Sequence, residues 1–222
     1  MQTRRFLRIK QLLDHRQPDL TVLMEQVHKP RNLAAVLRSA DAVGVLNTHL
    51  VPMPGLDLSR RPKAAAGTRP WVPLQAHKTI TQAYSQLKQQ GFRLVAAHPD
   101  ESAIDFRQLD YTGATCLVFG SELRGMSTWA VENADCLVSI PTVGMAQSLN
   151  VSVAAALILY EAQRQRQNSG QYSSCRIDSQ TYKHLLFEWT WPKIARHCQR
   201  LKIPYPAYDL NNGHLLEDVP RG

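Results

Sequence analysis

Short runs of apolar residues recur along the middle of the chain, and each has the length of a buried β-strand. These runs are rich in β-branched residues and lie at residues 20–27, 48–53, 93–97, 115–119 and 135–140. Segments with helix-like patterns separate them. Such alternation is typical of an α/β domain with a mostly parallel sheet and helices on both faces. We therefore expect an α/β domain over residues 20–166, with helical extensions at residues 1–19 and 167–222.

Three helices are expected inside this domain. The first begins near Asn32 and ends at Gly44, and its apolar residues recur at the spacing of one helical face. The second is expected over residues 79–90 and the third over residues 148–167.

Both extensions are expected to form amphipathic helices, each with an apolar stripe and a basic face. The stripes comprise Phe6, Ile9 and Leu13 in the first extension and Ile194, Cys198 and Leu201 in the last. The basic faces comprise Arg4 and Arg8 in the first and Lys193, Arg196 and Arg200 in the last. Trp189 and Trp191 precede the last helix, either as core anchors or as surfaces on which bases stack.

The 222-residue chain has a formal net charge of +8, and this charge is distributed unevenly. Residues 1–20 carry +3 and residues 164–202 carry +6, whereas residues 21–163 carry only +1. A polyanion bound across the extensions explains this segregation, and a solvated basic surface without a partner is the alternative. Inside the domain, the Pro- and Gly-rich segment 52–73 predicts a mobile basic loop over the carboxyl edge of the sheet. Its basic residues are Arg60, Arg61, Lys63 and Arg69.

Several classes of protein are disfavoured by composition. The longest apolar stretch, residues 151–160, is about half of what a membrane helix needs. No apolar segment follows the basic N-terminus, so we expect no signal peptide and a cytoplasmic location. The four cysteines show neither a Cys-x-x-Cys pair nor Cys/His ligand spacing, so neither a metal site nor a disulfide framework is expected.

Two familiar nucleotide-binding fingerprints are missing. No two glycines lie two positions apart, which excludes the GxGxxG motif of dinucleotide-dependent oxidoreductases and disfavours the common Gly-rich methyltransferase loop. Gly120 and Gly125 have the spacing of a phosphate-binding P-loop, but Met126 stands where the lysine should be. Binding of ATP or GTP is therefore not expected.

Three separated segments nevertheless form a recognisable set. They read HKPRNLAAVLR at residues 28–38, LVFGSELRG at residues 117–125 and IPTVGMAQSLNVS at residues 140–152. Together they resemble motifs 1, 2 and 3 of the SpoU class of SPOUT RNA ribose methyltransferases. Further matches, at residues 16–22, 185–188 and 201–206, resemble the branch that methylates guanosine-18 of tRNA.

This resemblance implies a deep trefoil knot around residues 118–150 and a homodimer packed through the knot, with each active site completed across the interface. It also implies S-adenosylmethionine as the methyl donor, held largely by backbone groups at Ala97, Gly120, Ile140 and Leu149. The implied partner is tRNA. Its expected contacts are Arg4, Arg8, Arg60, Arg61, Lys63, Lys193, Arg196 and Arg200.

The resemblance also assigns catalytic roles. Arg38 is expected to take the proton of the ribose 2′-hydroxyl. A guanidinium has a pKa above about 12, so Arg38 needs a bound phosphate to perturb it, or it instead stabilises the developing alkoxide. By position alone, Arg38 could simply pair with Asp41. Asn32, Glu122 and Asn150 are expected to position Arg38, the motif loops and the ribose.

Helix capping is the alternative for some of these residues. Asn32 could cap the first helix, and Ser148, which belongs to the expected catalytic set, or Asn150 could cap the third.

The function expected from this resemblance is 2′-O-methylation of guanosine-18 in the D-loop of tRNA. One alternative is methylation of ribosomal RNA or of another tRNA position, and a second is a non-catalytic RNA-binding module of the same fold.

Overall fold

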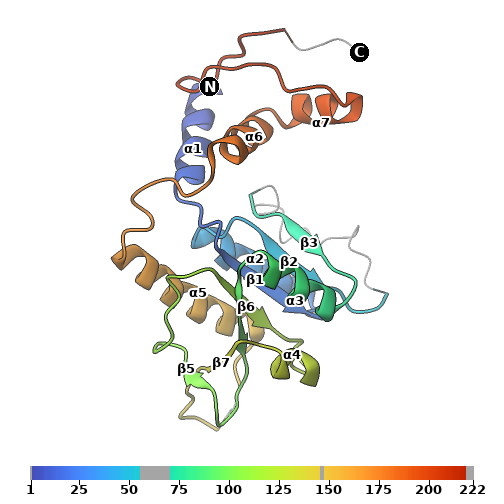
Figure 1. Ribbon diagram of the computed structural model, residues 1–222, viewed down its shortest axis with the longest axis vertical. Coiled ribbons are helices and arrows are strands. Elements are labelled where there is room, and N and C mark those ends of the chain that lie inside the picture. Colours follow the sequence, from blue (N-terminus) through green and yellow to red (C-terminus); the bar gives the residue numbers. More distant parts are fainter. Residues whose placement is uncertain (1, 56–70, 146–147, 219–222) are drawn as a thin grey trace. The chain divides into compact units, whose positions relative to one another are not determined.

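A computed structural model describes residues 2–55, 71–145 and 148–218 of the protein. Residues 17–171 contain a seven-stranded sheet (Figure 1). Its strand order is β3-β2-β1-β6-β4-β7-β5, and every neighbouring pair is parallel. The strands are β1 Leu20–Glu25, β2 Thr48–Val51, β3 Leu74–Ala76, β4 Arg93–Ala97, β5 Ile104–Asp105, β6 Thr115–Phe119 and β7 Cys136–Ser139. Parallel pairing places all carboxyl ends at one edge of the sheet, where ligands of α/β proteins usually bind.

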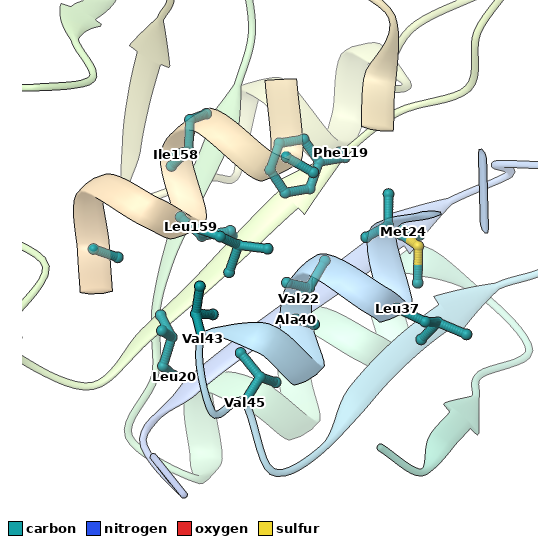
Figure 2. Packing of buried hydrophobic residues seen from close by; sticks show 14 of the residues in the cluster. Leu20, Val22, Met24, Leu37, Ala40, Val43, Val45, Phe119, Ile158 and Leu159 are labelled. Carbon is teal, nitrogen blue, oxygen red and sulfur yellow. The ribbon is translucent and has the colours of Figure 1, made fainter. Parts of the chain in front are cut away.

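Helices cover both faces of the sheet, as the sequence predicts. On one face lie α2 (Pro30–Ala42) and α5 (Val151–Asn168), which pack against each other and against β1 through a buried apolar cluster (Figure 2). On the other face lie α3 (Ile80–Gln89) and α4 (Thr128–Glu132), over a second cluster. Side chains of β1 alternate between these clusters because successive residues of a strand point to opposite faces.

All five expected strands and all three expected helices are present. The first strand ends at Glu25, before the expected Val27, because Gln26 leaves the extended conformation with a φ of 53°. Within residues 20–166 the structure adds three further elements that were not expected, namely β3, β5 and α4. They contain three, two and five residues, which is too short for a hydrophobic period to show.

The N-terminal and C-terminal extensions together form a second compact unit, made of Met1–Arg16 and Tyr172–Gly222, while Gln17–Gln171 forms the first. Its helices are α1 (Gln2–Asp14), α6 (Ser179–Thr190) and α7 (Pro192–Leu201). Phe6, Phe187, Trp191 and Tyr208 share ring contacts in its core. Trp189 is buried, with the guanidinium of Arg16 over its ring, so its interpretation as a core anchor is confirmed.

The apolar stripe expected in the last helix is partly wrong. Cys198 is buried as expected and Ile194 is half-buried, but Leu201 is 37% exposed. Leu201 is the last residue of α7, and Lys202 then turns the chain with a φ of 55°, so the end of the stripe does not reach the core. Ala195 is buried instead.

One basic residue of the positively charged segment 164–202 belongs to the core of the central unit. Arg166, near the end of α5, is completely buried and donates to carbonyl oxygens of Tyr111, Asp19 and Gly113. It also donates to the carboxylate of Asp19 at 2.6 Å and to the side chain of Gln17 at 3.2 Å. Its charge ties α5 to the loops before β1 and β6 and is not available to a polyanion.

Candidate active site

A cavity of about 320 Å³ lies at the carboxyl edge of the sheet. It is formed by the residues that follow β4, β6 and β7 and by the start of α5. The four residues expected to hold the methyl donor, Ala97, Gly120, Ile140 and Leu149, all line it. Glu122 and Ser148, two of the expected catalytic residues, line it as well. Segments distant in sequence therefore converge on one hollow.

The wall of the cavity after β6 is a tight loop, residues 120–126. Ser121 and Gly125 exchange backbone hydrogen bonds of 2.9 Å, and the hydroxyl of Ser121 accepts a third from the backbone N–H of Arg124. A Cβ on Gly120 would collide with the backbone of Gly125 and Met126. The loop therefore folds back at Gly120 only because this residue has no side chain, and it presents backbone to the cavity.

Glu122 holds this loop against the start of α2. Its Oε1 accepts hydrogen bonds from the side-chain amide of Asn32 at 2.7 Å and from the backbone N–H of Lys29 at 3.3 Å. His28 Nδ1 lies 3.1 Å from Oε2. Asn32 in turn accepts a hydrogen bond of 3.4 Å from the amide of Asn150. Three expected site residues, one from each motif, thus form one connected cluster.

The cluster shifts the pKa of Glu122. Burial favours the neutral carboxyl and opposes the shift, but hydrogen bonds from the backbone of Glu122 and from Asn32, together with the charge of His28, outweigh it. The pKa therefore lies below its ordinary value, and Glu122 is an acceptor for its neighbours rather than a proton donor.

Helix capping distinguishes the two asparagines. Lys29 occupies the N-cap position of α2 and Asn32 lies within the first turn, so the capping interpretation of Asn32 is wrong. Asn150 is the N-cap of α5, where its Oδ1 accepts from the backbone N–H of Ser152 at 2.9 Å. Asn150 therefore both caps α5 and contacts Asn32. Ser148 precedes the cap and lines the cavity.

Comparison with known proteins decides the family. The model of the SpoU rRNA methylase family matches residues 19–160, and the model of the SpoU rRNA methylase C-terminal region matches residues 164–218. This chain belongs to the SpoU methylase family.

Relatives of this SpoU protein include several tRNA-modifying enzymes. The tRNA (guanosine(18)-2′-O)-methyltransferase of Escherichia coli K12 is 48% identical over 93% of this chain and 90% of its own length. The protein of the same name from Thermus thermophilus is 48% identical over 82% of this chain and 93% of its own length. The crystal structure of the Aquifex aeolicus TrmH/SpoU tRNA modifying enzyme has a TM-score of 0.80 at 38% identity, covering 86% of this chain and 97% of the other.

Arg38 lies outside the cavity of this SpoU protein. It is exposed on α2, between the buried residues Leu37 and Ala40, and it is absent from the cavity lining. The expected RNA contacts Arg4, Arg8, Lys193, Arg196 and Arg200 are all exposed. The basic-loop residues Arg60, Arg61 and Lys63 lie outside the described residues.

Some residues of the site were not anticipated individually. His28 and Lys29 contact Glu122. Glu25 contacts Ser127, the residue that follows the tight loop 120–126, called the cavity loop below. The available signal for Glu25 was a single acidic residue at the end of an apolar run.

Within the described ranges, no cluster of His, Cys, Asp or Glu is suited to bind a metal ion. The same ranges contain no helix with the length and apolar character needed to span a bilayer.

The lowered pKa of Glu122 predicts a pH-dependent stability difference. A depressed carboxyl pKa stabilises the fold above the unfolded value of 4.5, and that contribution is lost as pH falls through the lower folded value. We expect Glu122→Gln to lower the free energy of unfolding by about 1 kcal/mol at pH 7. The difference from wild type should shrink as pH falls below 4.5.

Denaturant unfolding of both proteins from pH 7 to about pH 3.5 measures this, with exposed Glu101→Gln as the control. A difference that stays constant across this range would contradict the assignment.

Proposed function

We propose that this protein transfers a methyl group from S-adenosylmethionine to the ribose 2′-hydroxyl of guanosine-18 in the D-loop of tRNA. The observation that carries the proposal is a cavity lined by the second and third motif segments, with Asn32 of the first segment hydrogen-bonded to Glu122 in its wall. The chain is also 48% identical to tRNA (guanosine(18)-2′-O)-methyltransferases. Transfer of a radiolabelled methyl group to unmodified tRNA is the direct test of this activity.

The choice of tRNA over ribosomal RNA rests on the share of this chain that each relative matches. The E. coli tRNA enzyme matches 93% of this chain, whereas the 23S rRNA (guanosine-2′-O-)-methyltransferase RlmB of Pseudomonas syringae matches 71% at 36% identity. The larger match must include residues of the basic extensions. We therefore assign residues 20–166 to methyl transfer and the extensions, 1–19 and 167–222, to tRNA binding.

The cavity suits S-adenosylmethionine in size and in chemistry. Its volume is at the lower end of the range of small-molecule sites, about 300–1,000 Å³, and its walls combine apolar side chains with the backbone of Gly120. A related SpoU methyltransferase, AviRb from Streptomyces viridochromogenes, has been solved with AdoMet and is 28% identical, with a TM-score of 0.59. When bound, the donor supplies an electrophilic sulfonium methyl. Ala97, Gly120, Ile140 and Leu149 would hold it.

The residues of the chain then align the ribose and stabilise charge. Alignment of a hydroxyl with its electrophile accounts for much of the acceleration in oriented reactions. The cluster of Asn32, Glu122 and Asn150, with Ser148 beside it, fixes the loops that would hold the ribose in place. A guanidinium stays charged at neutral pH, so we assign Arg38 to stabilise the alkoxide that develops at O2′ while the proton leaves to solvent.

A homodimer is part of the proposal because α5 has an apolar face turned to solvent. Val153, Leu157 and Tyr160 of α5 recur at helical spacing and are 46%, 42% and 53% exposed, and Leu149, just before the helix, is 41% exposed. Contiguous exposed apolar side chains of this kind mark association surfaces. A second copy packed on this face would cover them and bring exposed groups of the partner to the cavity.

We expect Leu157→Glu to shift the protein toward monomer, because a charge would be buried without a partner in the interface. Analytical ultracentrifugation measures the shift, and methyl transfer should fall with it if each site is completed by the partner. Leu216→Glu, at an exposed leucine of the other unit, is the matched control. A Leu157→Glu protein that remains dimeric at the wild-type concentration would exclude this face.

The exposed arginines of α7 are proposed to contact tRNA phosphates. Replacing both Arg196 and Arg200 with alanine should flatten the dependence of log K on log salt by about 1.4–1.8 units, at about 0.7–0.9 per phosphate. Filter binding of tRNA at several salt concentrations measures the slope, and Arg107→Ala in the other unit is the control. An unchanged slope would remove α7 from the RNA contact.

The activity itself is tested with radiolabelled S-adenosylmethionine and unmodified tRNA, followed by mapping of the labelled nucleotide. Label at guanosine-18, absent when that position carries 2′-deoxyguanosine, supports the proposal. Label in ribosomal RNA or at another tRNA position supports the alternative substrates, and RNA binding without label supports a non-catalytic module. Because tRNA is the proposed substrate, we propose the cytoplasm as the location.

A further inference from the structure

A carboxylate of β1, on the face of the sheet that carries α3 and α4, contacts the residue that follows the cavity loop. Glu25 is the last residue of β1 and is only 4% exposed. Its two oxygens accept hydrogen bonds of 2.8 Å from the backbone N–H and the hydroxyl of Ser127. Burying a carboxylate is costly unless it is well hydrogen-bonded, so this arrangement is a specific one.

Ser127 connects three parts of the central unit, namely β1, the cavity loop and α4. It follows Met126, which lines the cavity and is buried with Ala130 and Tyr84 in the apolar cluster of that face. Its own hydroxyl accepts a hydrogen bond of 3.2 Å from the backbone N–H of Ala130, as the N-cap of α4. A single side chain therefore joins β1, the cavity loop and α4.

The cavity loop is consequently held at two points by two carboxylates. Glu122 lies within the loop and binds the start of α2. Glu25 binds Ser127, the residue that follows the loop. Between these points the loop closes on itself through Ser121 and Gly125. Glu25 is not among the residues that line the cavity, so its influence on the loop runs through this serine contact.

We propose that Glu25 is a positioning residue for the methyl donor: it fixes Ser127, and through Ser127 it fixes the backbone of residues 120–126 that lines the donor cavity. The inference rests on the proposed use of this cavity for S-adenosylmethionine. Preorganised backbone binds a ligand more tightly because less conformational freedom is lost on binding.

The test is the Kd of S-adenosylmethionine for the full-length protein, measured by isothermal titration calorimetry. Ser127→Ala removes the hydroxyl and should raise the Kd about tenfold. Glu25→Met removes both acceptors at similar length and should raise it further. Ser127→Thr keeps the hydroxyl and should restore a Kd within about twofold of wild type. In activity assays the KM for the donor should rise while the KM for tRNA stays unchanged.

Thr79→Ala is the matched control, because Thr79 caps α3 on the same face by accepting a hydrogen bond from Gln82. It removes a cap of the same kind without touching the cavity loop. If Thr79→Ala weakens donor binding as much as Ser127→Ala, the effect is a general loss of stability and the inference is overturned. An unchanged Kd in Ser127→Ala overturns it as well. Failure of the wild-type protein to bind the donor would instead contradict the proposed function.

Discussion

Replacing Arg38 with alanine is expected to lower kcat about 10³-fold, the range seen when a proton acceptor or an oxyanion-stabilising group is removed. The Kd values for S-adenosylmethionine and tRNA should stay near those of wild type. Arg38 is exposed and does not line the cavity, so its loss leaves the donor site intact. Single-turnover methyl transfer, combined with calorimetric binding of each substrate, measures the two effects separately.

Arg107→Ala provides the control for Arg38, since it removes another exposed arginine of the same unit and should leave kcat unchanged. The pH dependence of kcat distinguishes the two roles open to Arg38. A proton acceptor with a lowered pKa makes kcat rise with pH through that pKa, and the rise disappears in Arg38→Ala. Electrostatic stabilisation leaves the slope in place and lowers the whole profile. Normal turnover in Arg38→Ala would end the assignment.

Gly120→Ala is expected to weaken binding of S-adenosylmethionine by about 100-fold or more. The added Cβ would overlap the backbone of Gly125 and Met126, and backbone cannot move aside as a flexible side chain does. The loop would have to open, which would break the paired hydrogen bonds between Ser121 and Gly125. Calorimetric titration of the variant with the donor measures the loss.

Gly113→Ala is the matched control for Gly120→Ala. A Cβ at Gly113 meets no atom within 4 Å, so the same change of residue type should leave donor binding and stability close to wild type. Thermal unfolding of both variants shows whether Gly120→Ala remains folded. A folded Gly120→Ala protein with wild-type donor affinity would exclude this loop as a wall of the donor site.

The order of strands and helices could be predicted from the sequence because the apolar residues of each long element recur at the spacing typical of a strand or a helix. The run 115–119 is apolar after Thr115 because β6 lies in the middle of the sheet and is buried along its whole length. The short strands β3 and β5 lie at the two edges of that sheet and form few contacts, so they impose no such pattern. The trefoil knot stays a prediction, since hydrophobic periods do not encode how a chain is threaded.

The candidate site was predictable as a set of residues but not as a geometry. The motif resemblance named Asn32, Glu122 and Asn150, and the structure connects them through hydrogen bonds. Nothing in their spacing shows that Asn32 bridges the other two. The contact of Glu25 with Ser127 joins residues 102 positions apart, which no local pattern can reveal.

The net charge of a sequence segment does not show which of its basic residues are free to bind RNA, and the structure does. Arg164 pairs with Glu161 on α5, and Arg166 is buried among carbonyl groups, so two of the basic residues in segment 164–202 are already engaged within the central unit. The basic character of the C-terminal extension therefore resides in residues such as Lys193, Arg196 and Arg200 of α7, which are exposed.

The double role of Asn150 has an evolutionary consequence. The Oδ1 atom of Asn150 caps α5, and the side-chain amide N–H of the same residue donates a hydrogen bond to Asn32. Aspartate or serine could replace the cap but could not donate the amide hydrogen bond, while other donors such as lysine could not cap the helix. With the role proposed for Asn150 in positioning the ribose, selection for folding and selection for activity act on the same side chain. Few amino-acid substitutions should be tolerated at position 150. A relative that no longer transfers methyl groups should still have a helix-capping residue there.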